Sequence, residues 1–283
     1  MRQAGVGGVA GATAGETAKA SGVAGSRAGN ERPSLARMYD YYLGGSHNFA
    51  VDREAARQVI AAVPDAPLMA QANRAFLRRV VRYLTETGIR QFLDIGSGIP
   101  TAGNVHEIAV DAKVVYVDLD PVAVAHGREI LGGSDRATAI QADVRQPDRI
   151  LSHPDVRRLL DFDQPVAVMI VAVLHYIADA DDPAGLIGRL RDALAPGSYL
   201  ALSQTCGDGR GPDERLASEE VYRRADHPLH PRTRAEIGRL FAGFELVEPG
   251  VVWVPQWRPD AGCLDDPAAA GFVGGLGRKP GLP

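Results

Sequence analysis

Three aspartates, Asp94, Asp118 and Asp143, each stand at or near the end of a short apolar run. An ionised carboxylate accepts hydrogen bonds from hydroxyl, amino and ammonium groups. In an open sheet of parallel strands, ligands bind beyond the carboxyl ends of the strands. A single acid at such a place is often a helix cap. Three acids after three successive runs predict a ligand site with an acidic edge, which suits a cationic ligand.

A glycine turn, Gly96-Ser97-Gly98, follows the first of these runs. Glycine lacks Cβ and lets a ligand approach the backbone closely. The G-x-G-x-x-G pattern of a dinucleotide site would need a third glycine where Thr101 stands. Asp94 would also repel a pyrophosphate and attract an ammonium. The turn therefore favours S-adenosylmethionine, which carries an α-amino group and a sulfonium. On their own, the two glycines are equally compatible with a tight turn that binds nothing.

The other two acids are spaced as the rest of such a cofactor requires. Asp118 lies 22 residues after Gly96, close to the ~20 expected for an acid that accepts from ribose hydroxyls. Asp143 can accept from the adenine amino group, and the Val144 amide can donate to the ring. For Asp120 we expect the simpler role of capping the next helix.

Alternating strands and helices must position these residues. The patterns predict strands at residues 91–95, 113–118, 138–143, 166–174 and 199–203, and helices at 53–63, 69–87, 121–131, 183–194 and 233–241. This alternation predicts an α/β fold with a doubly wound, mostly parallel, seven-stranded sheet. Two further strand-like segments, 244–248 and 251–254, flank a Pro-Gly pair and predict a C-terminal antiparallel hairpin.

Composition limits the domain organisation of the 283 residues. Residues 1–32 are rich in Gly and Ala and are predicted to be a disordered tail. Residues 33–264 are predicted to form one domain with an N-terminal helical cap at 33–88. Residues 265–283 have a composition like that of the first tail and are predicted to be flexible.

Charge and cysteine content exclude several classes of function. A net charge of −4 argues against a strongly basic surface for nucleic acid. Two cysteines cannot build a disulfide framework, so a cytoplasmic location is expected. No apolar run reaches the length of a membrane span, and no membrane association is expected. Oligomeric state is left open.

The Asp94-x-Gly96-x-Gly98 turn together with Asp118 and Asp143 resembles the cofactor motifs of class I S-adenosylmethionine-dependent methyltransferases. More narrowly, the segment from Arg37 to Phe49 (RMYDYYLGGSHNF) and the Pro-Thr pair after the turn resemble a bacterial S-adenosyl methyltransferase family of largely uncharacterised substrate. The resemblance covers roughly residues 33 to 260 and implies a Rossmann-like methyltransferase fold. It also implies that the glycines contact the methionine part of S-adenosylmethionine, with S-adenosylhomocysteine as product.

The expected binding residues fall into two groups. The expected cofactor-binding residues are Asp94, Gly96, Ser97, Gly98, Thr101, Asp118, Leu119, Asp143, Val144 and Val171. The expected residues of a lid or acceptor pocket are Arg37, Tyr39, Tyr42, Asn48 and Phe49. The second group comes from an aromatic segment that a Gly-Gly pair interrupts. That segment is equally compatible with a packing helix that covers one face of the sheet.

His175, after the fourth strand, is the best-placed candidate for catalysis. It can act as a general base or as a wall of the pocket, and a loop histidine without a role is the alternative. A base is needed only if the attacked O, N, C or S atom must lose a proton. The Asn/Asp-Pro-Pro-Tyr/Phe motif of DNA amine methyltransferases is missing here, which favours a small-molecule acceptor. No metal site is expected.

The sequence thus predicts an S-adenosylmethionine-dependent methyltransferase whose acceptor is unidentified. One alternative is a regulatory protein that binds S-adenosylmethionine without turnover. A less favoured alternative is an NAD-dependent oxidoreductase, against which Thr101 and Asp94 both argue. None of these residues identifies the methyl acceptor.

Overall fold

The computed structural model describes residues 32–100, 103–208, 220, 228–260 and 266–281. The predicted N-terminal tail therefore lies outside the described residues, apart from its last residue. The helices are α1 (Leu35–Tyr42), α2 (Ala50–Ala62), α3 (Ala66–Glu86), α4 (Val105–Ile108), α5 (Pro121–Leu131), α6 (Pro147–Ser152), α7 (Pro154–Leu159), α8 (Pro183–Asp192) and α10 (Arg234–Arg239). The strands are β1 (Gln91–Ile95), β2 (Lys113–Asp118), β3 (Ala137–Gln141), β4 (Ala167–Val171), β5 (Tyr199–Thr205), β6 (Glu245–Leu246), β7 (Val252–Trp253) and β8 (Phe272–Arg278).

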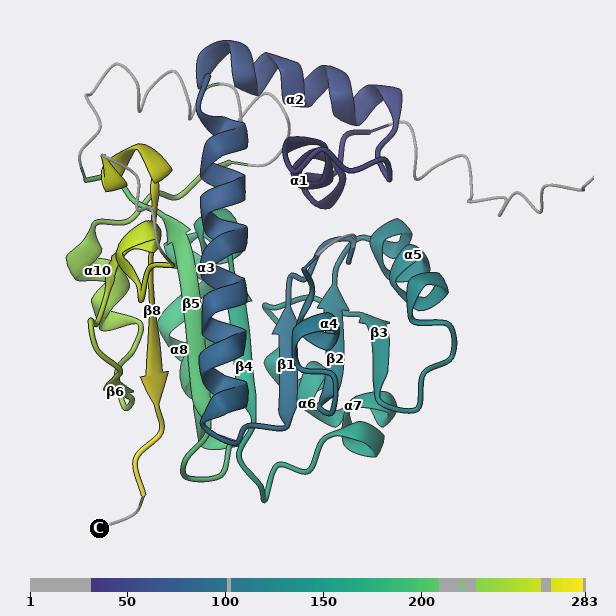
Figure 1. The fold of residues 1–283 in the computed structure, drawn as a ribbon, viewed down its shortest axis with the longest axis vertical. Helices are drawn as coiled ribbons and strands as arrows, with labels where there is room; N and C mark the ends of the chain where they lie inside the picture. The colour runs from purple at the N-terminus through teal and green to yellow at the C-terminus, as the bar shows by residue number, and fades with distance from the viewer. Residues whose placement is uncertain (1–31, 101–102, 209–219, 221–227, 261–265, 282–283) are drawn as a thin grey trace, which may run out of the picture.

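One sheet of eight strands forms the centre of the molecule (Figure 1). Its order is β3-β2-β1-β4-β5-β8-β6, and β7 also pairs with β8. Strands β1 to β5 are parallel, while β6, β7 and β8 join antiparallel. The predicted doubly wound, mostly parallel fold is confirmed, but the sheet has eight strands where seven were predicted, because β8 adds a strand from the C-terminal segment. The chain reverses its direction of winding between β1 and β4, where ligands bind in such sheets.

The C-terminal part of the sheet differs from the prediction in two ways. Strands β6 and β7 do not form a hairpin with each other, because each pairs with β8. Strand β8 itself lies in the segment that was predicted to be a flexible tail, and that prediction is wrong for residues 272–278. Its glycines reflect close packing: a Cβ on Gly274 would lie 2.9 Å from the Leu202 oxygen, and one on Gly277 would lie 2.8 Å from Phe244 Cβ.

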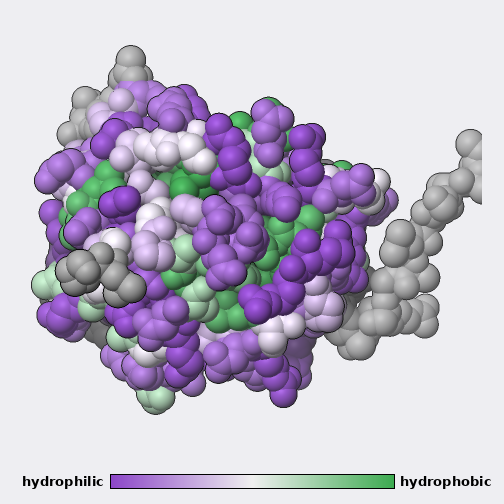
Figure 2. Space-filling view, turned by 90° about the horizontal axis from the view of Figure 1, so that it is seen from below, coloured by the Kyte–Doolittle hydropathy of each residue, from purple (hydrophilic) through white to green (hydrophobic). Residues whose placement is uncertain are grey.

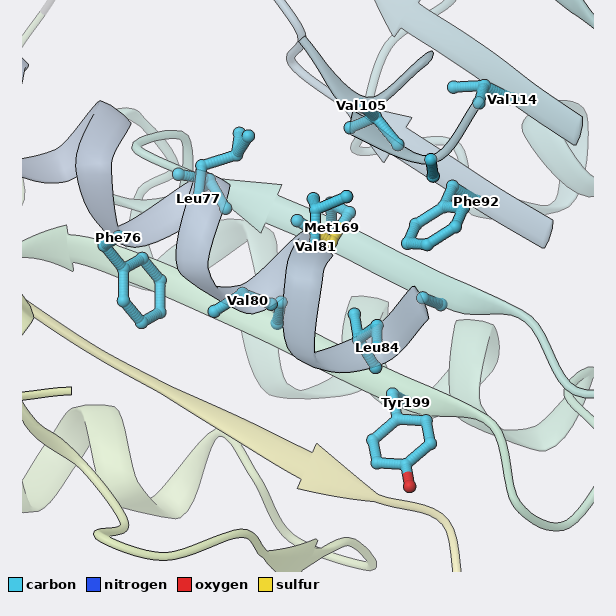
Figure 3. Packing of buried hydrophobic residues seen from close by; sticks show 14 of the residues in the cluster. Phe76, Leu77, Val80, Val81, Leu84, Phe92, Val105, Val114, Met169 and Tyr199 are labelled. Atoms are coloured by element: carbon cyan, nitrogen blue, oxygen red, sulfur yellow. The ribbon is translucent and has the colours of Figure 1, made fainter. Parts of the chain in front are cut away.

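Helix α3 covers one face of the sheet and supplies much of its core (Figure 3). Phe76, Val80 and Leu84 follow helical spacing and are fully buried against strand residues such as Phe92 and Met169. Burying a side chain of this size stabilises the fold by about 1.5–3 kcal/mol. The helix therefore holds a fixed position on the sheet and can place polar residues of its first turns accurately.

The opposite face of the sheet is covered by α6, α7, α8 and α10, which pack in a second core. Leu93 and Ile95 of β1 point to this core, whereas Phe92 points to the α3 side. This alternation is the period of two expected of a strand that is buried on both faces. The two layers leave the carboxyl ends of the strands as the available edge for a site.

Helices α1 and α2 lie above those carboxyl ends, at the top of the view in Figure 1. They pack on each other through Met38, Ala56 and Val59, and on the start of α3. The face at the other end of the strands is mostly hydrophilic, with apolar side chains visible between polar ones (Figure 2). Within the described ranges, no helix combines the length and apolar character needed to cross a membrane.

Candidate functional site

A cavity of about 780 Å³ lies between the carboxyl ends of the strands and helices α1, α2 and α3. Ligand pockets commonly measure ~300–1,000 Å³, so a nucleoside-sized ligand and a second small molecule can share it. Segments that end five strands line it: 94–98, 118–121, 142–145, 171–173 and 205–207. The residues at the strand ends, which were predicted to lie together at one edge of the sheet, therefore line this cavity.

The turn after β1 has a shape that only glycine adopts easily. Gly96 and Gly98 have φ values of +73° and +64°, in the left-handed region. A Cβ on Gly96 would lie 2.2 Å from Val173 Cγ2, whereas a Cβ on Gly98 would meet nothing within 4 Å. The backbone N–H groups of Gly96 and Ser97 donate to the Val117 oxygen at 2.7 and 3.1 Å. The turn is thus packed tightly between the ends of β2 and β4.

Asp118 joins this turn to the end of β2. Its Oδ2 accepts from the Gly98 N–H at 2.8 Å, and its Oδ1 accepts from the Asp120 N–H at 2.9 Å. Burial raises the pKa of Asp118, and these two hydrogen bonds oppose that rise. A carboxylate oxygen accepts more than one hydrogen bond, so Asp118 can still receive ligand hydroxyls. The neighbouring Leu119 is 57% exposed and also lines the cavity.

Asp94, near the end of β1, is a buried acid in the cavity wall. Burial raises its pKa to about 7, the nearby Arg74 guanidinium opposes this rise, and Asp118 adds to it. The Asp94 carboxyl is therefore partly protonated near neutral pH. An ammonium placed beside it would favour the ionised form. Arg74 lines the same wall from α3 and donates to Asn104 Oδ1.

Asp143, after β3, is held by Arg145 two residues later. Arg145 Nη2 lies 2.6 Å from Asp143 Oδ2, and Arg145 Nε lies 3.0 and 2.9 Å from the two carboxylate oxygens. Burial is the largest influence on Asp143 and raises its pKa, but the hydrogen bonds from Arg145 together lower it. A ligand amino group at this place would share the Asp143 oxygens with Arg145.

Arg37 connects α1 to two other helices. The buried guanidinium donates from Nε to Asp52 Oδ2 at 2.8 Å and from Nη1 to Asp120 Oδ2 at 2.9 Å. Asp120 caps α5 by accepting from the Val122 N–H, as the sequence predicted, and also accepts from the Ser34 hydroxyl. The start of α1 is thereby fixed next to the end of β2.

A chain of hydrogen bonds connects α1 to the other side of the cavity. Asn73 Nδ2 donates to the Tyr39 hydroxyl at 3.1 Å, and the Ser203 hydroxyl donates to Asn73 Oδ1 at 2.6 Å. Ser203 Oγ accepts in turn from the Ala172 N–H at 3.2 Å. Ala172 has a φ of +61° at the end of β4, a strained conformation for a residue with a side chain. Helix α1 therefore spans the cavity from β2 to β5.

His175 is buried in the cavity wall beyond β4. Its Nδ1 accepts from the Thr205 N–H at 3.4 Å. Burial, and then the Arg232 guanidinium, lower the pKa of His175 to about 3. The ring is therefore neutral near pH 7, and its single proton is on Nε2 because Nδ1 accepts. A general base works best with a pKa near the working pH, so this environment favours a wall and a hydrogen-bond donor.

The predicted lid residues divide into two sets. Arg37, Tyr39 and Tyr42 line the cavity, whereas Asn48 and Phe49 are not among its lining residues. Asn48 Nδ2 instead donates to Asp40 Oδ2 at 2.8 Å within the loop after α1. The Phe49 ring faces the Arg37 guanidinium, with 5.2 Å between the ring centroid and Cζ. These two residues shape the segment that carries the lining residues.

The other predicted residues lie as follows. Asp94, Gly96, Ser97, Gly98, Asp118, Leu119, Asp143, Val144, Val171 and His175 all line the cavity, and Thr101 lies outside the described residues. Sequence reasoning missed Asn73, Arg74 and Arg145, which also line the cavity. Their positions on a helix face or in a turn gave no chemical signal. In the part of the chain that the structure describes, no three His, Cys, Asp or Glu side chains are arranged to hold a metal ion.

Comparisons with known proteins agree with this geometry. The family model described as "S-adenosyl methyltransferase" matches residues 22–280. A candidate methyltransferase from Thermobifida fusca YX has 43% sequence identity and a TM-score of 0.83, with 88% of this chain and 96% of that chain covered. A DUF574 family protein from Streptomyces avermitilis MA-4680 has 39% identity and a TM-score of 0.85, with 90% and 100% covered. The comparison with curated proteins finds no match.

Proposed function

Because this chain belongs to the S-adenosyl methyltransferase family and is an S-adenosylmethionine-dependent methyltransferase, we propose that it methylates a small molecule bound in the cavity above its sheet. The cofactor takes the side of the cavity over β1, β2 and β3. The acceptor takes the side over β4, β5 and β8. One observation carries this assignment: Asp94, Asp118 and the glycine turn between them line one wall of a single cavity.

The residues of that wall suit the parts of the cofactor. Asp94 accepts from the methionine ammonium, and Arg74 binds the methionine carboxylate across from it. The Asp118 oxygens accept from the ribose hydroxyls, which is consistent with their place next to the Gly98 N–H. Asp143 and Val144 contact the adenine, and Arg145 keeps Asp143 ionised because its hydrogen bonds lower the Asp143 pKa.

The fit is supported by charge as well as by shape. Burial has raised the pKa of Asp94 to about 7, so this carboxyl gains from a cationic neighbour. A Cβ on Gly98 would meet nothing within 4 Å, and Gly98 lines the cavity, so a ligand has room to approach the backbone there. The bound cofactor supplies a methyl group, whose bond to sulfur breaks as the acceptor lone pair bonds to carbon, with the sulfur keeping the electron pair.

The protein's part in this reaction is to position the two molecules and exclude water. Helix α1 contributes by spanning the cavity, with Met38 and Tyr39 in its lining. Its two anchors, Arg37 on one side and Asn73 on the other, hold it across both halves. This arrangement supports a small acceptor that is enclosed under α1, rather than a macromolecular one.

Calorimetry with S-adenosylmethionine, S-adenosylhomocysteine and NAD tests the cofactor assignment. We expect both methionine-derived ligands to bind and NAD to bind at least tenfold more weakly. Asp118→Asn should weaken S-adenosylhomocysteine binding by about 10-fold or more, because a charged acceptor of hydrogen bonds is lost. The matched control is Asp111→Asn, at an exposed aspartate outside the cavity lining. Equal losses in both variants, or tight binding of NAD alone, would contradict the assignment.

Transfer of a labelled methyl group into a metabolite extract tests the acceptor assignment. We expect label in the fraction of small molecules, and we expect it to disappear when excess S-adenosylhomocysteine is added. Label that appears only in protein or nucleic acid would contradict a small-molecule acceptor while leaving the cofactor assignment intact.

A further inference from the structure

The charged side chains of the cavity are confined to one half of it. The charged lining residues are Arg32, Arg37, Arg74, Asp94, Asp118, Asp120, Asp143, Arg145 and Asp181. All except Asp181 either lie at the ends of β1, β2 and β3 or are connected to residues there. Arg37 pairs with Asp120 and binds the Arg32 oxygen, and Arg74 lies close enough to Asp94 to affect its pKa.

Asp181 fits the same division although it follows β4 in the chain. It lies near Arg145 and raises the Arg145 pKa, and Arg145 pairs with Asp143 after β3. We therefore count Asp181 with the β3 side, although Asp179 in the same turn pairs with Arg232. Among the described lining residues, no Asp, Glu, Lys or Arg remains for the half over β4, β5 and β8, which we call the neutral half.

The walls of the neutral half are mainly apolar and aromatic, and Thr205 and His230 also line the cavity there. Met38 of α1, Val63 just after α2 and Met69 of α3 add apolar side chains to the cavity lining. The strand ends contribute three rings, and the His175 ring contacts each of the other two. The His175 and Tyr176 ring centroids lie 4.2 Å apart, and those of His175 and Phe272 lie 5.7 Å apart at an interplanar angle of 73°. Such rings favour offset and edge contacts with a further aromatic ring.

One polar group in this half has a defined direction of hydrogen bonding. His175 uses Nδ1 to accept from the Thr205 N–H, so the neutral ring donates from Nε2. No described residue accepts from Nε2, and His175 lines the cavity. The Arg232 guanidinium donates to the Leu174 oxygen at 2.8 Å and lies close enough to lower the His175 pKa, which disfavours a second proton on the imidazole. The Nε2–H group of His175 can therefore donate a hydrogen bond to an oxygen atom of a ligand.

We propose that the methyl acceptor is an uncharged aromatic molecule that lies in the neutral half and accepts a hydrogen bond from His175 Nε2 through an oxygen atom. This inference rests on the proposed function, since it assumes that the cofactor fills the charged half. Ionised acceptors are disfavoured, because a charge would lose its hydration while no described lining residue of this half carries the opposite charge. The nearby Arg232 guanidinium does not line the cavity and is already paired with Asp179 at 2.6 Å. His175 then acts as a positioning and specificity residue.

Four naphthalenes of similar size test the proposal in the full-length protein saturated with S-adenosylhomocysteine. They are 2-acetylnaphthalene, naphthalene, 2-naphthoate and 2-(aminomethyl)naphthalene, each titrated by calorimetry or ligand-observed NMR. We expect 2-acetylnaphthalene to bind at least tenfold more tightly than the anion and the cation. We expect it to bind ~3–10-fold more tightly than naphthalene, which is the usual contribution of one neutral hydrogen bond.

Two substitutions separate the contributions of the donor and of the apolar wall. His175→Phe should remove the preference for 2-acetylnaphthalene over naphthalene, and His175→Gln, which keeps an N–H donor, should retain part of it. Val63→Asp should weaken the binding of 2-acetylnaphthalene by about tenfold or more and should strengthen the binding of the cationic probe, 2-(aminomethyl)naphthalene. Val110→Asp is the matched control, because Val110 is 61% exposed and does not line the cavity.

The possible outcomes distinguish this inference from the proposed function. If S-adenosylhomocysteine does not bind, the proposed function fails. If S-adenosylhomocysteine binds but a charged naphthalene binds as tightly as 2-acetylnaphthalene, only the neutral aromatic acceptor is overturned. The same conclusion follows if none of the four probes binds, or if His175→Phe leaves the preference for the carbonyl compound unchanged.

Discussion

Arg37 of α1 and Asp120 at the start of α5 form an ion pair, with 2.9 Å between Nη1 and Oδ2. The same guanidinium pairs with Asp52, which is fully buried. Asp120 also donates its N–H to Asp118, the proposed ribose ligand. The helix above the cavity is thus connected through two residues to the cofactor side of the site, and α1 and the cofactor wall should respond to the same substitutions.

The first prediction concerns the stability that this ion pair provides. Arg37→Leu should lower the free energy of unfolding by about 3–5 kcal/mol, because it leaves the Asp52 charge buried without its cation. Urea denaturation measures the loss. Arg57→Leu is the control, since Arg57 is 58% exposed and pairs with an exposed Glu54; this substitution should lower the free energy of unfolding by less than ~1 kcal/mol. Similar losses in both variants would show that the Arg37 pairs contribute little.

The second prediction is that cofactor affinity depends on pH through Asp94. The Asp94 pKa is raised to about 7, and only the ionised carboxylate attracts the methionine ammonium. Binding of S-adenosylhomocysteine should therefore strengthen by up to ~10-fold per unit between pH 5 and 7, because one proton is released. 5′-Methylthioadenosine lacks the ammonium and should show no such dependence. Parallel pH profiles for both ligands would exclude Asp94 as the ammonium ligand.

The third prediction follows from the same carboxyl in the ligand-free protein. Its pKa is raised on folding, so the folded state holds a proton that the unfolded state releases between about pH 4 and 7. Stability from Asp94 is therefore present at low pH and lost as pH rises to 7. Asp94→Asn should make the ligand-free protein more stable than the unsubstituted protein above pH 7, by at most about 4 kcal/mol, and should make little difference near pH 4. An equal effect at both pH values would contradict the raised pKa.

Much of this fold follows from residue patterns that act locally. Strands β1 and β2 and helix α5 begin and end where apolar spacing predicts. The gathering of Asp94, Asp118 and Asp143 at one cavity was also predictable, because parallel strands place their carboxyl ends on one edge. These features can be predicted without knowing which residues that are distant in the sequence contact each other.

Other features depend on contacts that only the complete fold creates. Asn73 and Ser203 are separated by 130 positions, and Arg37 and Asp120 by 83, so neither partner indicates the other in sequence. Asp143 was predicted to accept from an adenine amino group, but nothing in the sequence indicated that the Arg145 side chain also donates to both of its oxygens. Strand β8 was misjudged because its glycines, which the close packing against β5 and Phe244 requires, resemble those of a flexible tail.

The fourth prediction tests that strand. Removal of residues 271–283 should prevent folding, because β8 pairs with β5 along its whole length and buries Val273 and Leu276. A chain that ends at residue 280 keeps all of β8 and should melt like the full chain. Leu276→Ala gives a milder test and should lower the free energy of unfolding by about 2–5 kcal/mol. If the chain without residues 271–283 melts cooperatively at a temperature near that of the full protein, β8 is dispensable for folding.

The last prediction concerns the protonation of His175. With a pKa of about 3, this ring should stay neutral from pH 5 to 8, with its proton on Nε2. Two-dimensional NMR that correlates ring protons with ring nitrogens reports both properties directly. The unfolded chain has an ordinary histidine pKa, so lowering the pH from 6 to 4 protonates the unfolded state first and destabilises the protein, by about 1.4 kcal/mol per unit from this group. His175→Gln should remove that part of the pH dependence. A ring that titrates near pH 6.5, or carries its proton on Nδ1, would restore the general-base role and remove the donor on which acceptor selection rests.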